Sequence, residues 1–438
     1  MRVFVHRQLW DSAGLNNQLE ILSFEAEKTP MNPTTISVAD GAARRRSIAF
    51  LNLAHALDHF VLLIYPTVVI GLEVVFQRPY SELIALSSTA FLAFGIFSLP
   101  AGWLADRWSR RNMMALFYIG CGLSLVGVAL APSLLVLSAA MFLLGMFAAI
   151  YHPVGMAMLI EASNARGRTL AFNGVCGNLG VSLAAGVSAL LATLLGWRAA
   201  FLAPAVLAVA TGAFYLYVTP DDRHHAKNRT SAPAVRLSAR QAAMLFGLFI
   251  VIALTAGTVF NVLTIALPKI VDERLAENVP LLLVGSIATA VLVCGGLAQL
   301  CVGRLVERFP PHILFAVITV IGFAGNLWAA YADGIALMAA LAIAVAAIYG
   351  QVTVNDIVLA RYTADAWRGR VYAVRYFLLF ISAGVAIGMI SLLHEYGGFS
   401  LVLAVDSIIA LMMCIATIGL AVLVNGSEAA QGIPEAAE

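Results

Sequence analysis

The sequence predicts an all-α integral membrane protein with twelve transmembrane helices, arranged as two pseudo-symmetric six-helix bundles. Three observations support this fold class: the composition, the length of the apolar runs and an internal repeat. Of the 438 residues, 61% are apolar and 11% are charged, which leaves too little polar surface for a soluble globule of this size. The charges are grouped between apolar runs, each near the roughly 20 residues that a helix needs to cross a bilayer. These runs do not alternate apolar and polar residues, so we interpret them as helices and not as strands of a barrel.

Six predicted spans precede a long polar segment and six follow it. The first six cover residues 47–71, 82–105, 112–131, 134–160, 169–195 and 198–219. The second six cover residues 241–268, 280–303, 312–331, 335–360, 371–393 and 399–424. The polar segment Asp221–Arg240 separates the two groups, which predicts one bundle on each side of it.

The two halves share landmarks at one spacing. The run Gly102–Arg107 (GWLADR) has a degenerate copy 201 residues later in Gly303–Arg308 (GRLVER). The triplet Arg166–Arg168 (RGR) recurs 202 residues later as Arg368–Arg370. Two matches at nearly the same offset indicate a duplicated unit of about half the chain, and the unit is a membrane bundle.

Lysine and arginine predict the orientation, because they are retained on the cytoplasmic side of a membrane. They are concentrated in the N-terminal tail, in the loops that follow even-numbered spans and in the central segment. We therefore expect a multi-pass protein of a bacterial-type inner (plasma) membrane with both termini in the cytoplasm. The net charge of +2 gives no support for a nucleic-acid partner, and the lipid bilayer is the expected surrounding.

The predicted organisation has five segments. Residues 1–46 form a cytoplasmic, disordered tail in which Met31 is a candidate for the true start, and residues 425–438 form a second cytoplasmic tail. Residues 47–220 and 241–424 form the bundles, and the basic segment 221–240 links them in the cytoplasm. The five cysteines lie within spans without a CxxC pair, so we interpret them as small packing residues. We expect no cofactor, no metal and no catalytic residue.

Ionisable side chains inside a bilayer are costly, so those within the spans are candidates for function. His55, Asp58 and His59 stand at positions i, i+3 and i+4 of the first span and share one face of that helix. At about 1.5 Å per residue, Asp58 lies roughly 18 Å beyond the basic residues that precede the span, near mid-membrane. His152 lies at a similar depth, roughly 13 Å from the cytoplasmic end of the fourth span.

These four residues are predicted to take part in proton coupling or to contact a substrate. We interpret Asp58 as the proton-coupling residue, with His55, His59 and His152 as its partners or as substrate contacts. One alternative is that Asp58 and a histidine form a lasting pair that ties the first span to the fourth. Because His152 precedes Pro153, a role limited to bending the helix also stays open.

The second half carries amides in place of charges. Gln351 and Asn355 share one face of the tenth span, and Asn261 lies in the seventh. Amides suit recognition by hydrogen bonds, and hydrogen bonds between helices are an equally open interpretation. Asp356 and Arg375 lie one to two turns from a short loop between the tenth and eleventh spans, which predicts an ion pair between them.

The repeated motif is predicted to act as a latch at the cytoplasmic surface. Gly102 allows a close approach of another helix, and Asp106 can pair with basic residues and with a helix end of the other half. The residues assigned to this latch are Gly102, Asp106, Arg107, Arg110 and Arg111 in the first copy, and Gly303, Glu307 and Arg308 in the second. The alternative is that these arginines only follow the distribution of positive charge.

The motif from Gly102 to Arg111 resembles the loop 2-3 signature of the major facilitator superfamily, and the resemblance covers residues 45–425. Ser109 stands where the family pattern usually has a glycine. The stretch Tyr151–Gly155 (YHPVG) is similar to the aromatic-His-Pro stretch of fosmidomycin-resistance-like drug exporters. The resemblance implies a secondary transporter with one central site, lined by helices 1, 4, 7 and 10 and opened alternately to either side.

We therefore expect a transporter of a small molecule, proton-coupled and working in the direction of efflux, in the form of a monomer. Proton-coupled uptake of a small organic solute is the alternative direction. Two other classes stay as alternatives: a polytopic membrane enzyme that uses His55, Asp58 and His152 as acid, base or metal ligands, and a non-transporting sensor. An ATP-driven pump is disfavoured, because the chain has no Gly-x-x-x-x-Gly-Lys-Ser/Thr loop.

Overall fold

A computed structural model describes residues 38–162, 166–220, 239–275, 279–363 and 365–430. The chain falls into two compact units, residues 1–42 and 43–438. The described part of the first unit is only the beginning of the first helix, and all other described residues belong to the second unit. Every regular element in the described ranges is helical, which confirms the all-α fold class.

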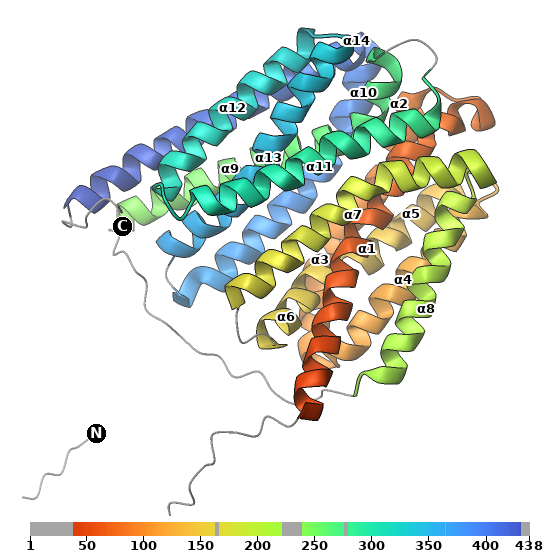
Figure 1. Ribbon diagram of the computed structural model, residues 1–438, viewed down its shortest axis with the longest axis horizontal. Helices are drawn as coiled ribbons and strands as arrows, with labels where there is room; N and C mark the ends of the chain where they lie inside the picture. Colours follow the sequence, from red (N-terminus) through yellow and green to blue (C-terminus); the bar gives the residue numbers. More distant parts are fainter. Residues whose placement is uncertain (1–37, 163–165, 221–238, 276–278, 364, 431–438) are drawn as a thin grey trace, which may run out of the picture. The chain divides into compact units, whose positions relative to one another are not determined.

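The helices of the first half are α1 (Val38–Phe76), α2 (Tyr80–Ala85), α3 (Ser88–Arg107), α4 (Arg110–Ala129), α5 (Leu134–Ala148), the π-helix η1 (Tyr151–Gly155), α6 (Met156–Ala162), α7 (Arg166–Leu195) and α8 (Ala199–Val218). Those of the second half are α9 (Ala239–Ile265), α10 (Leu267–Arg274), α11 (Leu281–Leu305), α12 (Pro311–Tyr331), α13 (Gly334–Tyr362) and α14 (Asp365–Ala430). Figure 1 shows how they are arranged.

By length and composition, eleven stretches among the described residues can cross a membrane, and the last of them, Phe377–Asn425, is 49 residues long. The helix that contains it, α14, is interrupted at Gly397 (φ −155°, ψ 19°) and Gly398 (φ 60°, ψ −164°). The positive φ of Gly398 is a conformation that glycine adopts at little cost. The break falls between the predicted spans 371–393 and 399–424, so the prediction of twelve spans agrees with the structure (Figure 1).

Three predicted spans are divided where side chains or a proline interrupt the backbone ladder, and the one expected at 134–160 is divided into α5, η1 and α6. The span expected at 82–105 is split into α2 and α3 by a turn at Leu86 and Ser87. The Ser87 hydroxyl donates to the Ile84 carbonyl at 2.6 Å, in competition with a helical bond. The span expected at 241–268 ends as α9, and Pro268 lies in the first turn of α10, where a missing N–H costs nothing.

The first helix begins earlier than expected. We predicted a tail up to residue 46, whereas α1 already starts at Val38. The residues just before the apolar part, Ala43 and the arginines 44–46, are all good helix formers. The helix therefore extends towards the N-terminus beyond its apolar part. The central segment 221–238 and the tail from 431 lie outside the described residues.

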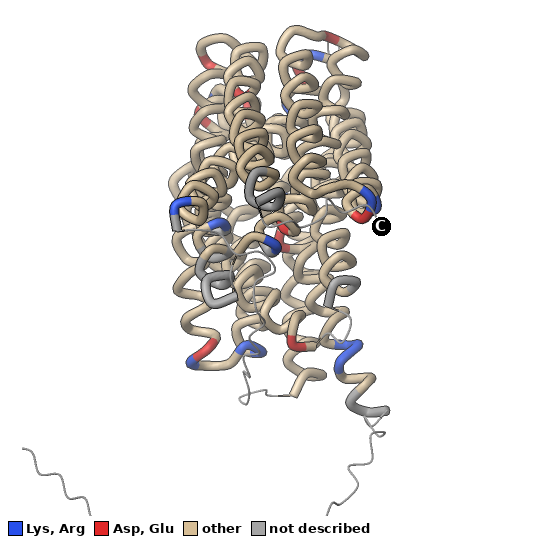
Figure 2. The backbone as a smooth tube through the Cα atoms, turned by 90° about the vertical axis from the view of Figure 1, so that its left-hand side faces the viewer, with Lys and Arg blue, Asp and Glu red and all other residues tan. Residues whose placement is uncertain are grey.

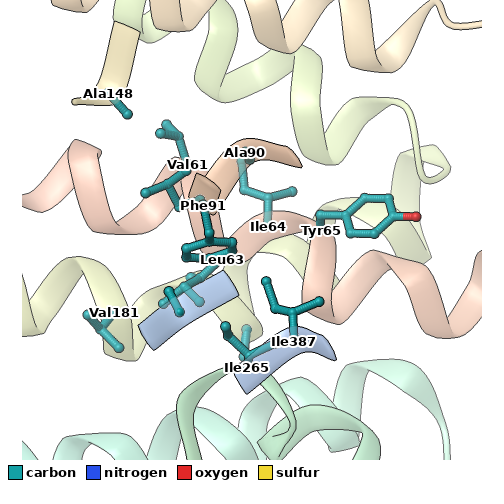
Figure 3. Close-up of a cluster of buried hydrophobic side chains, with 14 of the residues drawn as sticks. Val61, Leu63, Ile64, Tyr65, Ala90, Phe91, Ala148, Val181, Ile265 and Ile387 are labelled. Carbon is teal, nitrogen blue, oxygen red and sulfur yellow. The ribbon is translucent and has the colours of Figure 1, made fainter. Parts of the chain in front are cut away.

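Apolar side chains from both halves meet in the larger of two buried clusters that the described residues form. Figure 3 shows Ile64 and Tyr65 of α1 near Phe91 of α3, Ile265 of α9 and Ile387 of α14, all of them buried. Lipid is as apolar as these side chains, so close packing and interhelical hydrogen bonds hold such a bundle together. Figure 2 shows long stretches of helix without a charged residue, as a membrane-spanning protein requires.

Ser109 replaces the usual glycine of the motif without loosening the turn. Its backbone is extended (φ −169°, ψ 126°), and its hydroxyl accepts a hydrogen bond from the Asn112 N–H at 3.2 Å. Serine is among the best N-cap residues, so the hydroxyl stabilises the start of α4.

Candidate functional site

Three imidazoles, one buried and two partly buried, form a triangle between α1 and η1. The ring centroids of His55 and His59 are 5.1 Å apart, and the His152 ring lies 5.4 Å from His55 and 5.6 Å from His59. One ring nitrogen of each residue lies within 4.8 Å of those of the other two. The structure thus brings together the residues that the sequence places at similar depth on the first and fourth spans.

Asp58 completes this group, which we call the His–Asp cluster (His55, Asp58, His59 and His152). Its side chain is fully buried, and Oδ2 lies 3.3 Å from Nε2 of His152, close enough for an ion pair when the imidazole is protonated. No hydrogen bond from the described residues reaches either carboxylate oxygen. A buried carboxylate in this position is costly unless a cation or a proton neutralises it.

Asn173 of α7 supports the cluster and was not predicted from the sequence. Its backbone carbonyl lies 2.8 Å from Nδ1 of His55, so this nitrogen carries the hydrogen and Nε2 keeps its lone pair. The Asn173 side chain donates to Oδ1 of Asn52 at 3.0 Å and accepts from the Tyr151 hydroxyl at 3.0 Å. The signal in the sequence was one of two asparagines in a largely apolar helix, and its partners depend on how α7 packs against α1.

Tyr151 and His152 are presented by the π-helix η1. A proline has no N–H to donate, and the wider turn of a π-helix accommodates its ring. Gly155 is needed here, because a Cβ at this position would stand 2.7 Å from the Tyr151 ring. The Tyr151 ring stacks on His55 with centroids 4.9 Å apart. The Tyr-His-Pro stretch therefore replaces a turn of α-helix by a π-helix and also positions His152 beside Asp58. The choice between a role limited to bending the helix and a role in coupling stays open.

Two glycines of α7 allow this helix to approach α1. A Cβ at Gly180 would stand 2.0 Å from the carbonyl oxygen of Ala56, and a Cβ at Gly177 would stand 2.6 Å from Nε2 of His55. Neither contact is possible for a larger residue without a shift of the helices or of the imidazole. The glycines thus set the space in which His55 lies.

The second half reaches the cluster through an aromatic side chain. Phe380 of α14 has its ring centroid 5.3 Å from that of His152 and 4.3 Å from that of Phe94 in α3. The cluster therefore lies where the two halves meet. The sequence did not identify Phe380, because an aromatic residue in a span looks like ordinary packing.

The amides predicted in the second half differ in their described partners. Asn261 donates to the Gly257 carbonyl of its own helix at 2.7 Å. Gln351 and Asn355 of α13 are each 3% exposed, and Oε1 of Gln351 has no hydrogen-bond partner among the described residues. Arg375 of α14 donates to Asp356 of α13, which is the ion pair expected from the sequence positions. Substrate contact by the three amides stays a prediction.

The first copy of the repeated motif binds within its own half. Arg110 pairs with Asp106 at 3.0 Å and with Glu161 of α6, a residue that the sequence analysis did not assign. Nε of Arg111 donates to the Thr219 carbonyl at 2.6 Å. The described contacts of Arg110 thus join α3, α4 and α6. For Asp106 we expected a partner from the other half as well.

Other motif residues make fewer described contacts. Arg107 lies over the Trp103 ring at 4.3 Å, and a Cβ at Gly102 would stand 3.2 Å from Pro153 of η1. In the second copy, a Cβ at Gly303 would meet nothing within 4 Å, and Glu307 and Arg308 are exposed.

A second cluster of charges joins the two halves at the ends of the helices opposite to the repeated motif. Lys269 of α10 binds Glu73 of α1 at 2.6 Å and also Asp272 at 2.9 Å, while His394 of α14 lies 3.0 Å from Glu273. Burial alone lowers the pKa of Lys269, but the hydrogen bonds with Glu73 and Asp272 outweigh it and raise the pKa above 10.5. We call these five residues the Lys269 cluster. Sequence reasoning missed it, because its charges come from three separate helix ends.

Comparison with known proteins points to one family. The family model described as Major Facilitator Superfamily matches residues 48–277, a little more than half of the chain. YfnC of Bacillus subtilis (strain 168), described as an uncharacterized MFS-type transporter, is 24% identical over 172 residues. That alignment covers 39% of this chain and 42% of the relative, so the match spans less than half of the relative's length.

Proposed function

Because the chain belongs to the major facilitator superfamily, we propose that it is a secondary transporter that moves a small molecule across the membrane by alternating access. In this proposal one central site lies between the halves, and rocking of the halves opens it to one side at a time. Protons supply the energy, and the direction is efflux. The efflux direction is supported by the resemblance of Tyr151–Gly155 to drug exporters of the fosmidomycin-resistance type.

We further propose that the protein works as a monomer in a bacterial-type inner membrane with both termini in the cytoplasm. The support is the distribution of Lys and Arg over the loops and the presence of both halves, with the cluster between them, in one chain.

The observation that carries the coupling proposal is the position of Asp58. It is fully buried, it lies 3.3 Å from His152, and Phe380 of the other half packs against that histidine. A buried carboxylate inside the membrane is costly when charged, so the binding of a proton or another cation to Asp58 is favoured. A proton that neutralises Asp58 in one part of the cycle and leaves it in another would link proton movement to the rocking of the halves.

The test is proton movement in everted vesicles that hold a pH gradient, with small solutes and drugs added one at a time. Wild type is compared with Asp58→Asn and with Asp406→Asn as a matched control. Asp406 is also fully buried, but it lies in α14 and accepts a hydrogen bond from Asn326 at 2.6 Å. We expect at least one solute to dissipate the gradient in wild type and in Asp406→Asn, but not in Asp58→Asn.

Other outcomes assign other mechanisms. An equal response of wild type and a folded Asp58→Asn protein removes Asp58 from coupling. If a solute acidifies the interior of right-side-out vesicles that contain the wild type, but not of vesicles that contain Asp58→Asn, the direction is uptake. A wild type that responds to no solute in either orientation contradicts proton-coupled transport of the tested compounds.

A further inference from the structure

We propose that the His–Asp cluster binds a divalent transition-metal ion, such as Zn²⁺ or Ni²⁺, and that such an ion belongs to the substrate class of this protein. The second part rests on the proposed transport function, but neither part rests on proton coupling. From the sequence we expected no metal and considered metal binding by His55, Asp58 and His152 only for the alternative of a membrane enzyme. The two histidine-bearing spans are 97 residues apart in the chain, from His55 to His152. The folded arrangement of three imidazoles changes that expectation.

The geometry of the triangle suits an ion with small adjustments. The ligand nitrogens of His55, His59 and His152 lie within 4.8 Å of one another. The centre of an equilateral triangle of that size lies about 2.8 Å from each corner, against the roughly 2.0–2.1 Å of a Zn–N bond. Each ring therefore needs to move inward by about 0.7 Å, which side-chain rotation provides. Among the described residues this is the one group of three or more His, Cys, Asp or Glu with metal-binding spacing.

The surroundings of His55 match those of a metal ligand. Metal-binding histidines commonly donate the other ring N–H to a carbonyl or carboxylate, which fixes the tautomer and aims the free lone pair. Nδ1 of His55 has this partner in the Asn173 carbonyl at 2.8 Å. Gly177 leaves room at Nε2, where a Cβ would stand only 2.6 Å away. Because Nδ1 is engaged with the Asn173 carbonyl, Nε2 is the ring nitrogen of His55 that is available for coordination.

Asp58 supplies the charge and a fourth donor. Its Oδ2 is 3.3 Å from Nε2 of His152, and no described residue donates a hydrogen bond to either oxygen. Three imidazoles and one carboxylate make a tetrahedral donor set of the kind that Zn²⁺ accepts, and imidazole also suits Ni²⁺ and Cu²⁺. In a low-dielectric site the attraction between the carboxylate and a divalent cation is strong, whereas a neutral solute gains nothing from it.

Other histidines of the described residues lack this arrangement. His312 in α12 is bound to Asn425, and His394 in α14 is bound to Glu273, each away from a second imidazole. His312→Gln is therefore a matched control, because it removes a buried histidine while glutamine can still donate to Asn425.

The binding test uses the full chain, purified with a tag that contains no histidine and treated with a chelator. Co²⁺ is titrated into the protein, and its visible d–d absorption reports ligand number and geometry. We expect one tetrahedral Co²⁺ per chain that Zn²⁺ displaces. His55→Ala, His59→Ala and His152→Ala should each weaken binding by more than the roughly 10–100-fold that loss of a second-shell partner costs. His312→Gln should bind like wild type.

The ligands of the ion can also be identified in the wild type alone, which matters if a histidine variant fails to fold. X-ray absorption of the Zn²⁺-loaded wild type should show three imidazole ligands and one oxygen at about 2.0–2.1 Å. Absence of stoichiometric binding by the wild type overturns the proposal. So does binding that the three cluster variants leave unchanged.

The transport arm separates this inference from the proposed function. Proteoliposomes that enclose a zinc-sensitive dye are exposed to Zn²⁺, with His59→Ala and His312→Gln in parallel. Zinc entry in wild type and in His312→Gln, but not in His59→Ala, supports the substrate assignment. Binding without zinc movement overturns that assignment. Movement of another solute by a protein that binds no metal overturns the metal site and leaves the proposed transport function standing.

Discussion

Asn173 binds two other helical elements by four hydrogen bonds, one of them from its amide to the Leu51 carbonyl at 3.4 Å. Its carbonyl accepts from His55, and its amide binds Asn52 and Tyr151, so α1, α7 and η1 meet at one side chain. The alignment of His55 with Asp58 and His59 could be read from their spacing in the sequence, since i, i+3 and i+4 share a helix face. The part played by Asn173 could not, because it depends on contacts between helices more than a hundred residues apart.

Replacement of Asn173 by leucine should destabilise the protein and disturb the site. The change leaves the Tyr151 hydroxyl and the Asn52 amide oxygen without these buried partners, at a cost of about 1–3 kcal/mol. We expect a lower midpoint of thermal unfolding in detergent, followed by intrinsic fluorescence. Asn261→Leu is the control, since Asn261 donates to a carbonyl of its own helix and should cost less. Equal shifts in the two variants would contradict this account of Asn173.

At the scale of helices, hydropathy predicts where the chain crosses the membrane and misses where a crossing is interrupted. The runs near 82–105, 134–160 and 241–268 each appeared continuous, and each is broken in the structure. Two of the breaks have a proline as a local signal, Pro153 and Pro268. The third, after α2, depends on hydroxyls that bind carbonyls three residues back. A count of apolar residues contains no information on such bonds.

The approach of α7 to α1 gives a prediction that uses two glycines of one helix. An alanine at Gly177 would place its Cβ 2.6 Å from Nε2 of His55, whereas an alanine at Gly174 meets nothing within 4 Å. We expect Gly177→Ala to displace the imidazole and to reduce the affinity for Co²⁺ by about tenfold or more, as loss of ligand orientation does. Gly174→Ala should bind like wild type. Both proteins should elute as wild type in size-exclusion chromatography.

If Gly177→Ala binds Co²⁺ with unchanged affinity, the imidazole of His55 has more freedom than its contacts imply. If both variants lose binding, the effect belongs to the helix and not to His55.

At the scale of the molecule, the described ionic contacts are distributed unequally between the two ends of the helices. The Lys269 cluster joins α1 and α10, one from each half. At the other end, Arg110 joins Asp106 and Glu161 within the first half. The duplication in the sequence predicted latches at the cytoplasmic end only. It could not predict the Lys269 cluster, because no counterpart of Lys269 is repeated at the matching place.

Lys269→Gln should weaken the tie between the halves. The carboxylates of Glu73, Asp272 and Glu273 are 22–33% exposed, so solvent screens their attraction to Lys269. We expect the substitution to lower the free energy of unfolding by about 1–2 kcal/mol, less than the loss of one partner of a fully buried pair. Because the pKa of Lys269 is raised in the folded protein, this stabilisation is complete below pH 10.5 and is lost as the pH rises through the higher folded value.

The measurement is the difference in unfolding midpoint between wild type and Lys269→Gln at several pH values. We expect a constant difference from neutral pH to about pH 10 that shrinks above pH 10.5. Arg274→Gln is the control, since Arg274 binds Asp333 and the Ala332 carbonyl within the second half. A difference that shrinks already near neutral pH would show that another group supplies the charge.

The break at Gly397 and Gly398 has a consequence for topology. An unbroken α14 of 66 residues would be about 100 Å long, more than three times the hydrocarbon thickness of about 30 Å. The two glycines turn one over-long rod into two crossings, so that the eleven apolar stretches of the described residues make twelve crossings. After an even number of crossings, α14 ends at the face from which α1 started. Two residues without side chains thus decide on which side of the membrane the last helix ends.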